Sequence, residues 1–278
     1  MERIRKAVEQ ASKDRVANAG AESPDVDPND RSVRMTESHS GYVPPTEVNY
    51  TQTRNIIVSP VTRRNNRLAA AIPGHPLRDT YRMLRTRVLK QLKANGWNTV
   101  AVTSPATGSG KSLTAINLAI SLAMDLSHLV LLVDGDLRKP SIHNYFGYQP
   151  EFGLNDYLAN PDLPLSSILF HPDIDRLTVL PGRVSIDESA EQLSSPRALS
   201  LLKELSSRYP DRLILVDLPP VLTVDDALSL APNIDCMLMV AENGETTRED
   251  LYKAIDLLDG IPILGTVLNK SDIKLQAD

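Results

Sequence analysis

Residues 104–119 read SPATGSGKSLTAINLA, and the segment NTVAVTS (98–104) that leads into them has the apolar content of a buried strand. The GSGKS ending is typical of a phosphate-binding loop, in which glycines free the backbone and a lysine–serine pair supplies charge and a hydroxyl group. Pro105 stands where the general pattern has its first glycine. Because the loop follows a strand and opens a helix expected from Lys111 to about Met124, the sequence predicts a site for nucleotide phosphates.

The residues of this loop have separate expected roles. Backbone N–H groups and the helix N-terminus would face the phosphates. Lys111 would reach the β- and γ-phosphates, and the Ser112 hydroxyl would coordinate Mg²⁺. A turn that merely starts a helix is the competing interpretation, which the strand–loop–helix context disfavours. The residues expected to contact nucleotide here are Thr107, Gly108, Ser109, Gly110, Lys111, Ser112 and Leu113.

Three aspartates end predicted strands and extend the candidate site. Asp217 ends the apolar run LILVD, where an unpaired carboxylate is costly unless it meets a metal or a hydrogen-bond network. This is the expected place for a carboxylate of a Mg²⁺ site. Asp134 and Asp136 lie two residues apart in LLVDGDLRKP, so on an extended strand they point to the same side. Such a pair indicates a metal ligand or a base with a raised pKa, and an ordinary Asp-Gly turn is the alternative.

Composition limits the partners that we expect. The chain has 278 residues, 41% of them hydrophobic, which permits a sizeable core. A formal net charge of -5 gives no support for nucleic acid as a main partner. Cys236 is the only cysteine and lies in the apolar run DCMLMV, so it is expected to pack inside a strand. No apolar run approaches the ~20 residues that span a bilayer, and the first residues lack the apolar core of a signal peptide, so any membrane association is expected to be peripheral.

The chain divides by composition into an N-terminal part, residues 1–71, and a folded domain, residues 72–278. Apolar residues at helical spacing in the first 15 positions predict a short amphipathic helix, either frayed in solvent or docked on a partner. Residues 18–53 are rich in Pro, Ser, Asp and Asn, which predicts a flexible arm. Beyond residue 70, apolar strands alternate with helical periods, as in an α/β fold with a mainly parallel sheet. Strands are expected at 98–104, 129–136, 177–182, 212–220, 236–242 and 263–269.

The segments SPATGSGKS, LLVDGDLRKP and LILVDLPPV resemble, in order and spacing, the nucleotide motifs of bacterial tyrosine autokinases (BY-kinases) of the CpsD/CapB type. The resemblance covers about residues 72–272 and includes a proline near the start of the loop. It implies a P-loop NTPase fold, with a mainly parallel central sheet flanked by helices, and Mg²⁺-assisted transfer of the γ-phosphate of ATP to tyrosine.

The resemblance also implies roles for individual residues. Catalytic roles would fall to Lys111, Asp134, Asp136 and Asp217, with the Asp134 and Asp136 pair serving magnesium binding and activation of the tyrosine hydroxyl. The metal ligands would be Ser112, Asp134 and Asp217. Asn269 would contact adenine at the end of a strand, although NKSD (269–272) also matches the element by which GTPases bind guanine.

A helix expected before the loop carries charges in the segment DTYRMLR. Asp79, Arg82 and Arg85 are spaced i and i+3 and lie off its apolar stripe. In BY-kinases an acidic-x-x-Arg-x-x-Arg element at this place mediates ring assembly, so the resemblance implies a homo-oligomer, with a ring as one form. A surface pair within the helix is the alternative. The apolar stripe consists of Leu77, Tyr81, Leu84, Val88 and Leu92.

The resemblance implies a partner and a location as well. The partner would be an inner-membrane chain-length determinant (co-polymerase) protein of polysaccharide export, and the chain would lie in the cytoplasm at the inner face of the cell membrane. The chain lacks the C-terminal tyrosine cluster typical of these kinases, so Tyr42 and Tyr50 become candidate acceptors, and incidental residues of the arm are the alternative. That lack and the opening MERIRKAVEQA favour the exopolysaccharide-locus, exosortase-associated subgroup.

Two other functions remain open from the sequence. One is a MinD- or ParA-like switch ATPase, which carries an extra lysine early in the loop where this chain has Ala106. The other is a nucleotide-binding scaffold of the export machinery that has lost transfer activity.

Overall fold

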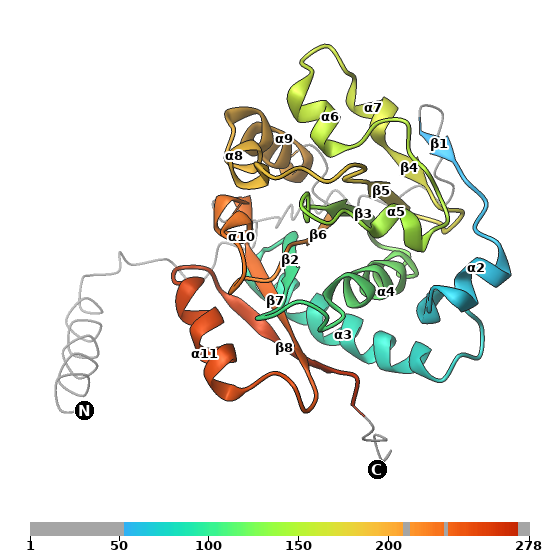
Figure 1. Cartoon of the computed structure of the whole chain (residues 1–278). Coiled ribbons are helices and arrows are strands. Elements are labelled where there is room, and N and C mark those ends of the chain that lie inside the picture. Colours follow the sequence, from blue (N-terminus) through green and yellow to red (C-terminus); the bar gives the residue numbers. More distant parts are fainter. Residues whose placement is uncertain (1–52, 208–211, 231–232, 272–278) are drawn as a thin grey trace, which may run out of the picture. The chain divides into compact units, whose positions relative to one another are not determined.

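The computed structural model describes residues 53–207, 212–230 and 233–271. Their centre is an eight-stranded sheet with strand order β1-β4-β5-β3-β6-β2-β7-β8 (Figure 1). Neighbouring strands are parallel except for β4 and β5, which are antiparallel. The strands are β1 (Arg54–Asn55), β2 (Thr99–Thr103), β3 (Leu129–Asp134), β4 (Phe170–His171), β5 (Leu177–Leu180), β6 (Arg212–Asp217), β7 (Cys236–Glu242) and β8 (Ile263–Asn269).

The predicted α/β architecture is confirmed in this part of the chain. All six predicted strands are present as β2, β3, β5, β6, β7 and β8, with ends that differ by at most three residues from those expected. Cys236 lies fully buried in β7, as its apolar neighbours predicted. Strands β1 and β4 have two residues each and were not predicted, because so short a segment carries no periodic pattern.

Helices cover both faces of the sheet, and the strand residues alternate between two cores. Val100 and Val102 pack with α3 and α4 on one face, whereas Ala101 packs with α9, α10 and α11 on the other. Strands buried on both faces explain the near-continuous Val, Leu and Ile runs in the sequence. The helices are α2 (Pro60–Asn65), η1 (Ala69–Ala71), α3 (Leu77–Asn95), α4 (Lys111–Ala123), α5 (Ile142–Tyr145), α6 (Leu154–Ala159), α7 (Leu165–Ile168), α8 (Ser189–Leu193), α9 (Pro196–Ser207), α10 (Asp226–Leu230) and α11 (Arg248–Leu257).

The packed region begins before the boundary at residue 71 that composition predicted. Residues 54–71 form β1, α2 and η1, and the Leu68 side chain is fully buried. The buried Asn117 side chain of α4 holds this segment, because its Oδ1 accepts the Ala70 N–H at 2.9 Å and its Nδ2 donates to the Arg67 carbonyl at 3.1 Å. The short run LAAAI thus joins the core although its neighbours are polar. The predicted N-terminal helix and the arm up to residue 52 lie outside the described residues.

Helix α3 follows its predicted apolar stripe except at its first residue. Val88 and Leu92 are buried, and Tyr81 and Leu84 are partly buried against the same core. Leu77 is 52% exposed, so its predicted place in the stripe is wrong, because the first turn of the helix extends past the packed surface. Among the described helices, none combines the length and apolar content that a membrane span requires.

Candidate functional site

The phosphate-binding loop joins β2 to α4 at the edge of the sheet where parallel strands end. Gly108 and Gly110 both have a φ of 85°, a conformation that residues with a Cβ rarely adopt. Gly110 also precedes the first residue of α4, and no side chain caps the N–H groups of the first helical turn. These uncapped N–H groups, at the positive end of the helix dipole, suit an anion such as a phosphate.

Pro105 fits this loop without distorting it. Its carbonyl accepts the N–H of Leu222 at 3.2 Å, and a proline has no N–H of its own that would need a partner. The hydroxyls of Ser104 and Ser109 both donate to the carbonyl of Ala106, at 2.7 and 3.0 Å. Two side chains therefore hold the start of the loop, and the first glycine of the general pattern is dispensable here.

Lys111 lies between two of the predicted aspartates. Its Nζ is 2.7 Å from Asp136 Oδ2 and 3.8 Å from Asp217 Oδ1. Burial alone would lower the pKa of the Lys111 ammonium, but the charges of Asp217 and Asp136 outweigh it and raise the pKa above its ordinary value. The lysine is therefore charged and is held by carboxylates at the base of the loop.

Asp134 and Asp217 are fully buried and lie opposite each other on the paired strands β3 and β6. Burial, together with the charge of Asp217, raises the pKa of Asp134 to about 8, although the carboxylate accepts the N–H groups of Ser141 and Ile142 at 3.0 Å each. Burial also raises the pKa of Asp217 to about 6, against the opposing effects of Lys111 and the nearby Ser112 hydroxyl. A cation bound beside them would favour the charged form of both carboxyl groups and lower these pKa values.

Unpaired oxygen atoms show where that cation would fit. Asp134 Oδ1 and both carboxylate oxygens of Asp217 are buried and have no hydrogen-bond partner among the described residues. Such atoms are costly unless a metal or a donor joins them. No three His, Cys, Asp or Glu side chains in the described ranges form a complete metal site. Mg²⁺ is commonly held by one or two carboxylates together with substrate phosphates.

Asp136 is fixed from both of its oxygens. Oδ2 contacts Lys111, and Oδ1 accepts the N–H of Lys139 at 3.0 Å. The loop that carries Asp136 is further held by Arg138, whose Nε donates at 3.2 Å to the buried carboxylate of Asp226. Asp226 was not predicted from the sequence. The segment DDALSLA could have indicated it, because it places an acidic residue at the start of a helix in an otherwise apolar stretch.

Asn269 lies at the end of β8 against the loop. Its Nδ2 donates to the Ser109 carbonyl at 2.8 Å. A Cβ on Gly110 would collide with this amide nitrogen, so Gly110 is required both for its φ and for the approach of Asn269. The side chain thus supports the loop directly, and its expected contact with adenine stays a prediction.

The remaining loop residues differ in their exposure. Thr107 is exposed and, with Ser109, lines a cavity of about 260 Å³ whose other wall is the acidic segment around Glu242 and Asp250. Ser112 and Leu113 are half-buried in the first turn of α4.

The charged residues of α3 lie away from the loop. Arg82 pairs with Asp79 at 3.0 Å on the exposed surface. This is the pair within the helix that was expected from the sequence as the alternative. Arg85 donates to the Ser121 carbonyl near the C-terminal end of α4, at 2.9 Å. A role of the three residues between subunits stays a prediction.

Known proteins resemble this chain in sequence and structure. The family model described as ParA, NUBPL iron-transfer P-loop NTPase, matches residues 96–277. The putative tyrosine-protein kinase EpsB of Ralstonia nicotianae is 32% identical over 207 residues, 74% of this chain and 27% of EpsB. The tyrosine-protein kinase YwqD of Bacillus subtilis is 31% identical over 208 residues, 74% of this chain and 86% of YwqD. The kinase domain of the Escherichia coli tyrosine kinase ETK superposes with a TM-score of 0.66 and 27% identity, over 76% of this chain and 84% of that domain.

These similarities confirm the expected P-loop NTPase fold. The chain spans about a quarter of the length of EpsB but most of the length of YwqD.

Proposed function

The chain belongs to the P-loop NTPases and, among them, to the bacterial tyrosine-protein kinases, and on that premise we propose that it transfers the γ-phosphate of ATP to tyrosine, including its own. One observation carries the proposal. A charged, largely buried lysine lies beside uncapped helix N–H groups and between Asp136 and Asp217, and the Asp217 oxygens have no hydrogen-bond partner among the described residues. This arrangement supplies phosphate binding, a cation site and a base within one small region.

Binding of the phosphates would rearrange the ion pairs of Lys111. The lysine bonds Asp136 in the ligand-free chain, and to reach a phosphate it must exchange that carboxylate for phosphate oxygens. The exchange releases Asp136 Oδ2 beside the reacting phosphate. Asp136 would then accept the proton of the tyrosine hydroxyl, while the tyrosine oxygen bonds the γ-phosphorus and the bond from that phosphorus to ADP breaks.

The unpaired oxygens of Asp134 and Asp217 and the Ser112 hydroxyl would hold Mg²⁺, as the buried atoms without partners support. Mg²⁺, when bound, neutralises negative charge on the phosphate oxygens. The loop glycines and the first turn of α4 would keep the phosphates in place through backbone N–H groups, which excludes water from the same positions.

The proposal extends to the cellular setting. We propose that phosphorylation regulates the chain length, biosynthesis or export of an exopolysaccharide, together with an inner-membrane chain-length determinant protein, at the inner face of the membrane. The resemblance of the three nucleotide motifs to those of BY-kinases supports this setting. Assembly into a homo-oligomer would use Asp79, Arg82 and Arg85, of which Asp79 and Arg82 are exposed.

A second candidate, a ParA-like ATPase, is favoured by the family model that matches residues 96–277. Such an ATPase would release inorganic phosphate and label no tyrosine. A chain that binds ATP and forms oligomers, yet neither hydrolyses nor transfers, would instead be a scaffold.

Phosphosite mass spectrometry on the purified chain with Mg-ATP tests the proposal, with and without the cytoplasmic segment of the membrane partner. We expect phosphotyrosine that disappears in Lys111→Met. The matched control is Lys90→Met, which removes an exposed lysine of α3 remote from the loop. Phosphotyrosine in all three proteins would exclude the loop from the chemistry. Absence of phosphotyrosine in every mixture, with ATP binding intact, would favour the ATPase or the scaffold.

A further inference from the structure

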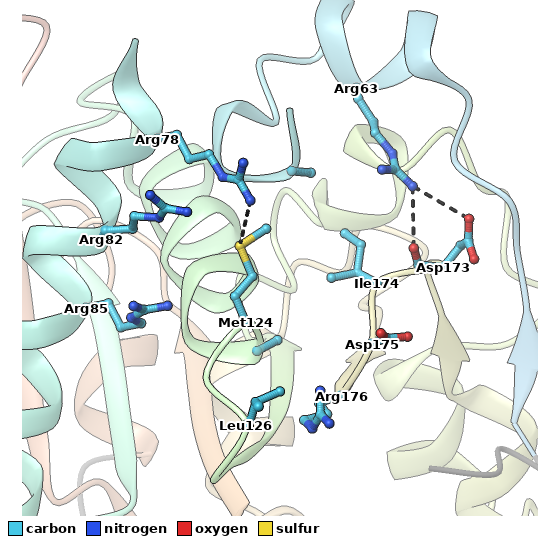
Figure 2. Close-up of a pocket in the computed structure, with 12 residues that line it drawn as sticks. Arg63, Arg78, Arg82, Arg85, Met124, Leu126, Asp173, Ile174, Asp175 and Arg176 are labelled. Carbon is cyan, nitrogen blue, oxygen red and sulfur yellow. Dashed lines mark hydrogen bonds and ion pairs between the residues drawn. The ribbon is translucent and has the colours of Figure 1, made fainter. Parts of the chain in front are cut away.

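A cavity of about 710 Å³ lies at the opposite end of α4 from the phosphate-binding loop. Its walls are α3, the end of α4 near Met124 and the segment before β5 that contains Ile174 (Figure 2). Ligand pockets in proteins commonly have volumes of about 300–1,000 Å³. The cavity is therefore large enough for a small organic molecule, and it is separate from the nucleotide site.

Arginine dominates the lining of this cavity. In Figure 2 the side chains of Arg78, Arg82 and Arg85 extend from α3 toward the segment with Asp175 and Arg176. Five arginines and two aspartates line the space, so its lining carries a formal charge of 5 − 2 = +3. The charged residues are Arg63, Arg78, Arg82, Arg85, Arg176, Asp173 and Asp175.

Three of these arginines have partners. Arg63 lies 3.6 Å from the Asp173 carboxylate, which also lines the cavity. Arg82 pairs with Asp79, and Arg85 donates to the carbonyl of Ser121. The Arg85 contact also covers a carbonyl near the negative end of the α4 dipole, which would otherwise oppose a bound anion.

Arg78 and Arg176 are different, because neither has an acidic partner among the described residues. Among the described residues, Nη2 of Arg78 has one hydrogen-bond partner, the Met124 sulfur at 3.8 Å, and a thioether is a weak acceptor. Nε of Arg78 and Nε of Arg176 are buried and have no hydrogen-bond partner in the described part of the chain. A guanidinium remains charged at every ordinary pH, so two charged groups, each with a buried Nε that lacks a described partner, line one cavity.

We propose that this cavity binds a small phosphate compound that carries two or more negative charges. The planar guanidinium group can donate two parallel hydrogen bonds to two phosphate oxygens. An anion bound between several arginines also reduces the repulsion among their positive charges. Arg78 and Arg176 are half-buried, so the ligand must enter the cavity rather than rest on its rim. An acidic surface of a second copy would instead meet the exposed Arg82 first.

Titration calorimetry with sodium pyrophosphate tests the proposal on the full chain. The wild-type chain is expected to bind two equivalents, one in the phosphate loop and one in the cavity. Lys111→Met should retain the cavity site alone. On that background, Arg78→Gln and Arg176→Gln should each weaken binding roughly tenfold or more, since each removes a charged hydrogen-bond donor.

The matched control is Arg87→Gln, which removes the same charge from an exposed position of α3 outside the cavity and should leave the affinity unchanged. Arg78→Lys keeps the charge without the two parallel donors and should give an intermediate affinity. If Lys111→Met fails to fold, loss of one of two equivalents in Arg78→Gln of the wild-type chain reports the same result.

Three outcomes would overturn the proposal. The first is a single equivalent in the wild-type chain with no binding to Lys111→Met. The second is equal weakening by Arg87→Gln and Arg78→Gln, which would indicate an adventitious ion only. The third is a changed sedimentation coefficient for Arg78→Gln or Arg176→Gln with pyrophosphate binding intact, which would make the cavity a contact between copies. None of these readouts depends on kinase activity.

Discussion

Substitution of Gly110 by alanine should destabilise the chain by more than the same substitution at Gly108, because of Asn269. Both glycines have a φ of 85°, and a left-handed conformation costs a residue with a Cβ about 1–2 kcal/mol. A Cβ on Gly108 would meet no atom within 4 Å. A Cβ on Gly110 would collide with the Asn269 amide, which must then leave the Ser109 carbonyl and lose a hydrogen bond of about 1 kcal/mol.

The expected losses in the free energy of unfolding are therefore about 1–2 kcal/mol for Gly108→Ala and about 2–3 kcal/mol for Gly110→Ala. Each substitution also restricts the unfolded chain, and this effect is similar for the two glycines. It therefore cancels when the two losses in unfolding free energy are subtracted. Urea unfolding followed by the fluorescence of Trp97, the only tryptophan, measures both values.

A double-mutant cycle isolates the part due to Asn269. On an Asn269→Ala background the collision is removed, so Gly110→Ala should cost no more than Gly108→Ala. Equal losses for the two glycine variants in the wild-type background would refute the reasoning, as would an unchanged difference in the Asn269→Ala background.

The other predictions concern pH, assembly and the acceptor. Because burial raises the pKa of Asp134 from 3.8 to about 8, the folded chain without ligand retains a proton there that the unfolded chain releases. The stability that this proton contributes is complete below pH 3.8 and is lost as the pH rises to about 8. Asp134→Asn removes the titrating group, so its free energy of unfolding should decline less steeply between pH 6 and 8 than that of the wild-type chain. The difference in slope, measured by denaturant titrations at several pH values, should be up to about 1 kcal/mol per pH unit. Arg82→Ala should cost less than about 1 kcal/mol of stability, since its pair is exposed, yet shift the oligomer toward monomer in sedimentation velocity; an unchanged species would remove it from the subunit contact. Arg85→Ala should cost more stability than Arg82→Ala, because it loses a partly buried bond to α4 rather than an exposed ion pair, and equal melting temperatures would contradict this. Tyr42→Phe with Tyr50→Phe should abolish autophosphorylation seen by phosphotyrosine mass spectrometry, and full labelling of the double variant would locate the acceptor elsewhere.

The strands and the phosphate loop could be predicted because their signals are local. A buried parallel strand needs a continuous apolar run, and a phosphate loop needs particular residues at fixed spacing. Both can therefore be identified from a short segment of sequence. Asp217 was found for the same reason, since a carboxylate at the end of an apolar run has few structural explanations.

The features that were missed depend on packing between distant segments. Leu77 continues a helical stripe, but only the tertiary structure determines that no surface lies opposite it. Asn269 meets the loop across 160 positions of sequence. The arginine-lined cavity combines α2, α3 and the segment before β5, and each contributes charges that resemble an ordinary solvated surface when taken alone.

The hydrogen bond from Asn269 to the loop has a consequence for the order of events at the ribosome. The lysine and glycines of the loop emerge early, but the strand that supports them is synthesised about 160 residues later. At a translation rate of about 5–20 residues per second, the nascent loop spends roughly ten seconds or more without that support. We therefore expect the loop to reach its final conformation, and any phosphate affinity that depends on it, only after β8 has docked.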